Sequence, residues 1–303
     1  MKLAKLLLIG LSMTYAISGI AADKLFKTYI LAEKKAGEVT TVVSETKAKL
    51  TNAGFTIVGE YSPYASATIL IVTNDDLKAN AAASEFGAFG AAQRVTVTKV
   101  ENEIQVAFTN PEYMANVYRM KNDLSAVSAK LKSTLGDLGE YGPEEGLTAK
   151  KLRDYQYKWL MPYFEDRLTL ANYGSQSIAL TKVESALANN KAGVKSIYRI
   201  DLPGKEETVI GVSMAGPDHI DCSGDKYIMD KIDFKKVKSS GHLPYEIVIS
   251  KGDVYALPAE FRIAISFPDL SMMGSNSFAS IMCAPTAIQE ALTIGVGSKY
   301  VAN

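Results

Sequence analysis

The sequence contains few of the residues that most often carry catalysis or hold metals. Among 303 residues there are two Cys, two His and one Trp, and 33 basic residues balance 33 acidic ones. A disulfide-dense miniprotein needs far more Cys, and a nucleic-acid-binding protein normally carries a basic excess. With 47% hydrophobic and 22% charged residues, the composition indicates an ordinary globular protein. We therefore expect no nucleic-acid partner.

The N-terminus carries the pattern of a secretory signal. Lysines at positions 2 and 5 precede an apolar run over 6–20, which ends in Ala21 and Ala22. This combination is typical of a cleaved Sec-type signal peptide over residues 1–22. A retained membrane anchor is the alternative, but the run is shorter than the ~20 residues that a spanning helix needs. We expect a periplasmic or secreted protein without a transmembrane segment after cleavage.

A turn-rich stretch divides the rest of the chain. Four Gly and one Pro fall between Gly136 and Gly146, with three Glu among them, and such a stretch is hard to bury. We expect a first module over 23–135, a linker with a short aromatic helix over 136–163, and a second module over 164–303 with an insertion near 217–240.

Hydrophobic periodicity predicts alternating strands and helices in the first module. A strand near 26–31 precedes a helix over 39–52, which Gly54 ends at a position that favours positive φ. The later elements of this module are four strands and one long helix, over 55–61, 68–72, 95–98, 104–106 and 111–135.

The second module shows the same predicted order. A strand near 167–171 precedes a helix over 177–189, and the later predicted elements are strands and a broken helix, over 194–200, 208–214, 245–250, 254–257, 261–267 and 268–292. The fold class is therefore α+β, with two tandem β-α-β(4)-α modules.

Two anchors suggest an internal duplication. The segment 106–112 aligns with 263–269 at an offset of 157, and Gly54 aligns with Gly193 at an offset of 139. The offset is larger at the later anchor, and we interpret the increase as the length of the insertion in the second copy. Similarity at a fixed spacing is the usual sign of a repeat.

Four short motifs carry a resemblance to a known family. They are Gly-Phe-Thr-Ile at 54–57, Phe-Thr-Asn-Pro-Glu-Tyr-Met at 108–114, Leu-Pro-Tyr-Glu-Ile-Val at 243–248 and Ile-Ser-Phe-Pro-Asp-Leu at 265–270. In these motifs the chain resembles the bacterial domain-of-unknown-function 302 family. It departs from that family at the central Gly-Asn-Pro turn, which is Thr-Asn-Asp at 73–75 and Ala-Gly-Pro at 215–217.

The resemblance covers about three quarters of the chain beyond residue 22. It implies a TATA-binding-protein-like topology in each module, which is a curved antiparallel sheet with helices on one face. It implies no activity.

Both cysteines lie in the second module and leave three alternatives open. In an oxidising compartment Cys222 and Cys283 can form a disulfide. They can also stay free, or join His219 and Met282 in a soft-ligand site of the kind that suits Cu(I). No motif of diagnostic metal spacing supports copper, and we predict no other cofactor.

Signals for catalysis are weak. Ser213 lies in a Gly-Val-Ser-Met-Ala-Gly string, but Pro217 and Asp218 follow where a nucleophile elbow needs a helix. No Gly-rich phosphate-binding loop is present in the sequence. We therefore lean against an enzyme.

One cluster of aromatic residues stands out, close to the predicted linker. It can dock the connector onto a sheet, or it can form an exposed patch for a partner. Its members are Tyr155, Tyr157, Trp159, Tyr163 and Phe164.

The composition and the motifs favour a non-catalytic binding or accessory protein. Its ligand would be a partner protein or a small apolar molecule, held where the small residues of 81–83 leave space. The alternative is a copper-type or redox-associated protein that uses His219, Cys222, Met282 and Cys283. A homodimer is compatible with either. Because the second module holds both Cys, both His and the insertion, we expect the specialised function there.

Overall fold

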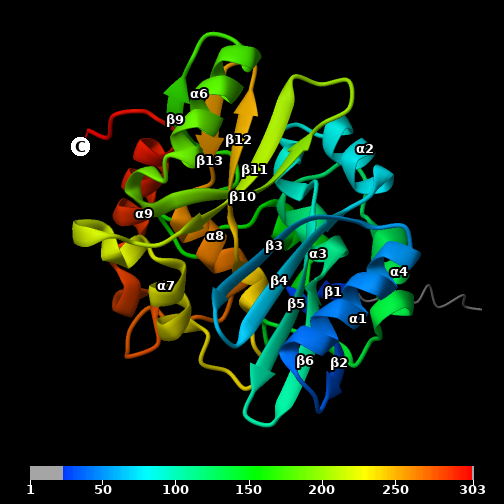
Figure 1. Cartoon of the computed structure of the whole chain (residues 1–303). Coiled ribbons are helices and arrows are strands. Elements are labelled where there is room, and N and C mark those ends of the chain that lie inside the picture. Colours follow the sequence, from blue (N-terminus) through cyan, green and yellow to red (C-terminus); the bar gives the residue numbers. More distant parts are fainter. Residues whose placement is uncertain (1–22, 302–303) are drawn as a thin grey trace, which may run out of the picture.

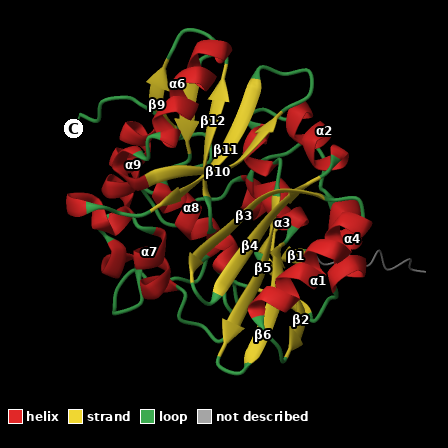
Figure 2. Ribbon diagram, in the orientation of Figure 1, coloured by secondary structure: helices red, strands yellow, loops and turns green. Residues whose placement is uncertain are grey.

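The computed structural model describes residues 23–301, and the predicted signal peptide lies outside them. The described chain is an α+β protein built on two open antiparallel sheets, which are the lower and upper sheets of Figure 1. Figure 2 shows helices packed around both sheets. Among residues 23–301, no helix has the length and the apolar character that crossing a membrane requires.

The first sheet has the strand order β3-β4-β5-β6-β2-β7. Its elements, with their connecting helices, are β2 (Tyr29–Lys35), α1 (Val39–Asn52), β3 (Thr56–Tyr64), β4 (Ala67–Thr73), α2 (Asp75–Ala83), η1 (Gly87–Gly90), β5 (Gln93–Val100), β6 (Glu103–Thr109), α3 (Pro111–Val117), α4 (Ser125–Leu135) and β7 (Gly139–Tyr141).

Local sequence explains the packing of α1 on this sheet. Val42, Val43 and Leu50 recur at helical spacing and are buried, so one stripe of the helix faces the core. Gly54 follows the helix with φ of 81°, which a residue with a Cβ adopts only at a cost. The predicted helix over 39–52 is confirmed.

The second sheet has the strand order β10-β11-β12-β13-β9. Its elements are β9 (Leu168–Asn172), α6 (Gln176–Ala188), η2 (Lys191–Gly193), β10 (Val194–Asp201), β11 (Glu207–Met214), η3 (Asp218–Ser223), α7 (Asp225–Ile232), η4 (Ser240–His242), β12 (Tyr245–Ser250), β13 (Asp253–Ala256), α8 (Ala259–Ser266), η5 (Phe278–Ile281) and α9 (Ala284–Gly295).

Apart from β7, which has no counterpart in the second sheet, the two sheets have the same strand order and the same places for two β-bulges. The first strand of each sheet has an extra residue opposite its partner, Ala32 in β2 and Leu170 in β9. The following strand of the chain forms an edge of each sheet and also has an extra residue, which is Val58 in β3 and Ile197 in β10. Bulges are specific features of a ladder, so their matched places support the predicted duplication, which remains a prediction.

The predicted strand over 261–267 is wrong. Residues 261–266 belong to helix α8, and Phe267 is its C-cap. The strand that pairs with β12 is β13, at the place of the short pairing predicted over 254–257. Seven of the eight residues of α8 are buried, and a helix buried on all sides shows no 3.6-residue period that would distinguish it from a strand.

This error also invalidates one anchor of the duplication, because 106–112 contains strand residues and 263–269 contains helix residues. The ladders give a different correspondence. In the first half Ile71 of β4 pairs with Arg94 of β5, and in the second half Gly211 of β11 pairs with Glu246 of β12. The second of these connections is the longer one, so the insertion lies between these strands. This insertion is shorter than the length predicted from the difference between the two anchor offsets.

Two other predicted elements differ from the structure. The long helix over 111–135 is divided into α3 and α4, because Arg119 and Leu124 adopt left-handed backbone with φ of 50° and 58°. The broken helix over 268–292 consists of an irregular segment, η5 and α9.

The stretch predicted as a linker contributes to regular structure. Its strand β7 pairs with β2 at the edge of the first sheet, and β8 (Leu147–Thr148) pairs with β1 (Leu25–Phe26). Helix α5 (Ala149–Arg153) then begins at the Thr148 cap.

Candidate functional site

The edge strands β3 and β10 lie against each other where the two sheets meet (Figure 1). Gly59 makes this approach possible, since a Cβ there would lie 2.9 Å from the Cβ of Tyr198. Each sheet also receives a short helical turn from the other half of the chain. η1 contacts β11 and β12, and η4 contacts β4, β5 and β6. The interior between the sheets is therefore built by both halves.

A buried cluster of charges lies in this interior. Arg94 of β5 and Arg262 of α8 both form ion pairs with Glu246 of β12, and Arg262 Nε lies 3.3 Å from Glu246 Oε2. All three side chains are buried. Burial and the neighbouring Arg262 charge lower the pKa of Arg94 from its usual value. One carboxylate thus balances two guanidinium groups, and its removal would leave both charges uncompensated.

His242 connects this cluster to Ser266. Its Nδ1 lies 2.9 Å from Ser266 Oγ and its Nε2 lies 3.2 Å from the hydroxyl of Tyr245. Arg262 donates to the His242 carbonyl at 2.7 Å. Burial, with Arg262 and Arg94 nearby, lowers the pKa of His242 well below its usual value, so the ring is neutral at pH 7.

Ser266 is not arranged as a nucleophile. It is buried, its hydroxyl donates to the Arg262 carbonyl at 2.9 Å, and its oxygen accepts from Arg262 Nη1 at 3.3 Å. Hydrogen bonds to its own helix and to a guanidinium group fix the Ser266 side chain, which helps to hold the cluster in place. A nucleophilic serine needs a hydroxyl that a base activates and that can reach a substrate, and Ser266 does not have this arrangement.

A pocket with about 230 Å³ of interior space opens beside Ser266. Three segments build it: the end of β7, the chain from the end of α7 to η4, and the chain that follows α8. Most of its lining is apolar, from Tyr141, Gly142, Ile232, Phe234, Val237, Phe267, Pro268 and Leu270. Its polar lining comes from Asp233, Lys235, Ser239, Ser266 and Asp269. Small-molecule sites typically combine such walls with a few polar groups.

One buried carboxyl group lies in the wall of this pocket. Asp233 is 8% exposed, and its Oδ1 accepts from the Ser239 N–H at 3.0 Å. Its Oδ2 is buried and has no hydrogen-bond partner among residues 23–301. Burial raises the pKa of Asp233 to about 6, although the Ser239 N–H and the nearby Lys238 charge oppose the shift. A buried acceptor without a donor is costly.

The segment that carries Asp233 is tied to the first sheet. Gln105 of β6 donates to the Lys236 carbonyl at 3.0 Å and accepts from the Lys238 N–H at 3.0 Å. The hydroxyl of Tyr141 donates to the Lys238 carbonyl at 2.7 Å. These three bonds join residues far apart in the sequence, so the wall of the pocket is held in place by both halves of the chain.

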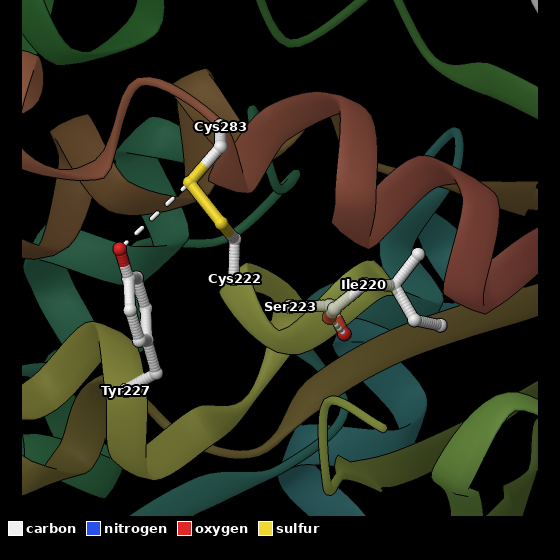
Figure 3. The surroundings of a disulfide bond; sticks show 5 residues. All are labelled: Ile220, Cys222, Ser223, Tyr227 and Cys283. Carbon is white, nitrogen blue, oxygen red and sulfur yellow. Dashed lines mark hydrogen bonds between the residues drawn. A yellow bond between two sulfur atoms is a disulfide. The ribbon is translucent and has the colours of Figure 1, made fainter. Parts of the chain in front are cut away.

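The structure contains the predicted disulfide between Cys222 and Cys283. It joins η3 to the start of α9, with the two Cα atoms 5.9 Å apart. Figure 3 shows the hydroxyl of Tyr227 directed at Cys283, whose Sγ lies 3.8 Å away. The bond therefore ties the insertion before α7 to the C-terminal helix.

The other two predicted copper ligands do not gather around the sulfur atoms as a closed site. His219 is exposed and pairs with Glu290 at 2.9 Å, and Met282 is 79% exposed. With both sulfurs in the disulfide, no thiolate is present for Cu(I) in this structure. Among the described residues, no cluster of three or more His, Cys, Asp or Glu side chains could hold a metal. The copper alternative stays a prediction.

The predicted aromatic cluster is divided between the interior and the surface. Tyr155 is buried and donates to the Ala264 carbonyl at 3.0 Å. Phe164 is buried against Phe89, Tyr118 and Phe261. These two residues dock the connector.

The other three members of the cluster lie nearer the surface. Tyr157 is partly buried and donates to the Leu270 carbonyl. Tyr163 is partly buried, and Trp159 is 84% exposed. Only Trp159 is thus available for a partner surface in the way that the patch hypothesis requires.

Asp233 and the pocket around it were not predicted from the sequence. The residues of 81–83, where we expected space for a ligand, lie in α2 and do not line this pocket. The insertion expected near 217–240 does supply one wall. One weak signal was available, because Asp233 stands between Ile232 and Phe234, and an acid between two large apolar residues is unusual on a solvated turn.

Comparisons with protein-family models, with curated proteins and with solved structures find no significant match to this chain. The resemblance to the domain-of-unknown-function 302 family therefore rests on the motifs alone.

Proposed function

We propose that the protein is a non-catalytic binding protein that holds a small apolar molecule in the pocket around Asp233. The observation that carries the proposal is the mostly apolar lining of this pocket together with a buried carboxyl oxygen of Asp233 that has no partner among residues 23–301. Such a combination positions a ligand by one polar contact and stabilises it by apolar burial.

Two features support a location outside the cytoplasm. The segment over 1–22 has the composition of a Sec-type signal peptide, and the disulfide between Cys222 and Cys283 is typical of an oxidising compartment. We therefore propose binding in the periplasm or after secretion.

The arrangement of Ser266 and His242 supports binding over catalysis. The serine beside the pocket is engaged with Arg262 and His242, and burial keeps the histidine neutral. The pair therefore stabilises the interior behind the pocket, and the pocket itself supplies the ligand contacts.

A partner protein is a second candidate for a different surface. Trp159 and its neighbour Leu160 are 84% and 78% exposed, and Trp is enriched among the residues that dominate protein interfaces. Trp159→Ser should then abolish partner capture without changing small-molecule binding.

The pocket proposal is tested by filling the pocket. Val237 is a partly exposed wall residue, so Val237→Trp places an indole near the opening while the buried core stays unchanged. The mature protein is titrated with the uncharged dye N-phenyl-1-naphthylamine and with hexanol as a competitor, followed by fluorescence. We expect wild-type protein to bind the dye and hexanol to displace it, and the variant to lose this binding.

Ile178→Trp is the matched control, because Ile178 is an exposed apolar residue on α6 and does not line the pocket. If dye binding is the same in both Trp variants, or if hexanol displaces none of the dye from the wild type, the pocket is not the binding site.

A further inference from the structure

We propose that the ligand carries a protonated amine at one end of its small apolar body and that this ammonium group binds Asp233. The inference rests on the proposed function and narrows it to a chemical class. It follows from the charges and hydrogen bonds around one carboxyl group, because these decide which polar group can complete it.

The carboxyl group of Asp233 lacks one donor. Oδ1 accepts from Ser239, whereas Oδ2 has no partner among the described residues. The side chain is more than nine-tenths buried, so water compensates little of this deficit. Asp233 lines the pocket, so a ligand that donates a hydrogen bond to its carboxyl group would remove the cost of the unpaired acceptor.

Nearby cations are committed to other groups. Lys238 Nζ donates to the backbone carbonyl of Asp233 at 2.7 Å and not to its carboxylate. Lys235 is largely exposed at the rim of the pocket, where its Nζ lies 3.9 Å from Asp269. A ligand ammonium would therefore meet the carboxylate without displacing an existing ion pair.

A second carboxyl group of the pocket, that of Asp269, accepts from the Glu144 N–H and lies near Lys235. The other groups near Asp233 are neutral tyrosines from the first sheet. Burial raises the pKa of Tyr29, Tyr64 and Tyr141 above its ordinary value. The Tyr64 hydroxyl pairs with Ser240 and that of Tyr141 with the Lys238 carbonyl, while that of Tyr29 has no partner among residues 23–301. No cation from β2, β3 or β7 neutralises the carboxylate.

An ammonium group fits this environment better than the other common head groups. It donates a charge-assisted bond and neutralises the buried carboxylate in the same contact. An alcohol supplies a donor but no charge, and a carboxylate ligand would be repelled by Asp233. The interior space of about 230 Å³ is roughly eight times the volume of one water molecule in the liquid, so the apolar body is small.

The experiment compares probes that share a body and differ in the head group. Calorimetric titrations of the mature protein at pH 7.5 use 2-phenylethylamine, 2-phenylethanol and 3-phenylpropanoate, with hexylamine and hexanol as a second pair. We expect each amine to bind about tenfold or more tightly than its alcohol, in line with the strength of charge-assisted bonds, and the acid to bind most weakly.

The pH dependence gives an independent readout. An ammonium is bound best by the ionised carboxyl group, and the pKa of Asp233 in the empty pocket is about 6. Amine affinity should therefore fall as the pH is lowered through about 6. Alcohol affinity should stay nearly constant over the same range.

Two variants separate the head group from the fold. Asp233→Asn keeps the shape and the bond from Ser239 but removes the charge, so the amine should lose its advantage over the alcohol. Asp225→Asn is the matched control. Asp225 is also buried, at the opposite end of α7, and its pKa is raised to about 7 by burial, but it does not line the pocket. This variant should keep the amine preference.

The outcomes distinguish the two proposals. Equal binding of amine and alcohol, or an unchanged preference in Asp233→Asn, overturns the ammonium assignment and leaves the apolar pocket intact. If none of the five probes binds and hexanol displaces no dye, the proposed function fails as well.

Discussion

Each half of the chain contains its own sheet, and the halves differ in the connection between the second and third strands of the sheet order, β4 to β5 and β11 to β12. In the first half, residues 74–92 form α2 and η1. In the second half, residues 215–244 form η3, α7 and η4, and the disulfide joins η3 to α9. The shared strands and bulges supply the scaffold, while the longer connection supplies one wall of the pocket. Binding is therefore proposed where the halves differ.

Residues at equivalent places of the two ladders are complementary where they meet. Gly59 lies against Tyr198, so a small residue faces a large one. Arg94 and Glu246 form a buried ion pair. Neither contact could form if both halves carried the same residue at that place, because two tyrosines would collide and two arginines would repel each other. The halves are thus adapted to each other.

The largest predicted effect comes from removing the charge between the halves. Glu246→Ala leaves Arg94 and Arg262 buried without their carboxylate, and we expect the free energy of unfolding to fall by about 3–5 kcal/mol. Urea denaturation followed by far-UV circular dichroism measures this value. Glu206→Ala, on an exposed turn next to β11, should change it by less than about 0.5 kcal/mol. A loss below about 1 kcal/mol in Glu246→Ala would contradict the view that the pair joins the halves.

The disulfide tests the feature that only the second half contains. Its two cysteines are 61 residues apart, and closing such a loop restricts the unfolded chain. The double variant Cys222→Ala and Cys283→Ala should therefore lose about 2–4 kcal/mol of unfolding free energy. Wild-type protein measured with and without reductant provides the control. If the reduced wild type and the double variant are as stable as the oxidised protein, the bond does not stabilise the insertion.

The smallest predicted effect concerns the packing of Tyr198, whose Cβ lies against Gly59 of the other half and whose ring packs within the second sheet. The ring of Tyr198 covers Gly211, so a Cβ at this position would overlap the ring. Gly211→Ala should cost about 1–3 kcal/mol, as overpacked cores typically do. In the background of Tyr198→Ala the same change should cost much less. Equal costs in both backgrounds would show that the ring does not set the limit.

Much of the scaffold could be predicted from the sequence, because its signals are local. Helix α1 has a buried stripe and a closing Gly54, and β4 is a short run of β-branched and aliphatic residues between turns. Helix α8 could not be predicted in this way, since burial on nearly every side removes the contrast between apolar and polar faces. The pairing of β7 with β2 joins segments far apart along the chain, and no local pattern encodes such a contact.

The cysteine pairing could be predicted from the sequence, whereas the pocket could not. Two cysteines in one module of a chain with a signal-like N-terminus offer few alternatives to a disulfide. Asp233, in contrast, is marked in the sequence only by its apolar neighbours Ile232 and Phe234. Its place in the proposed binding site depends on neighbours that are distant in the sequence or irregular in structure, such as Tyr29 and Ser239. One of its two carboxyl oxygens has no donor among the described residues.

The pairing of Arg94 with Glu246 has a consequence for assembly between molecules. The first half supplies Arg94 and the second half supplies Glu246. Two first halves, or two second halves, therefore cannot form this ion pair. If two chains exchange parts through the connection over 136–163, the contact can form again only between the first half of one molecule and the second half of the other. Exchange between chains would therefore preserve the order of the halves and build reciprocal, domain-swapped dimers.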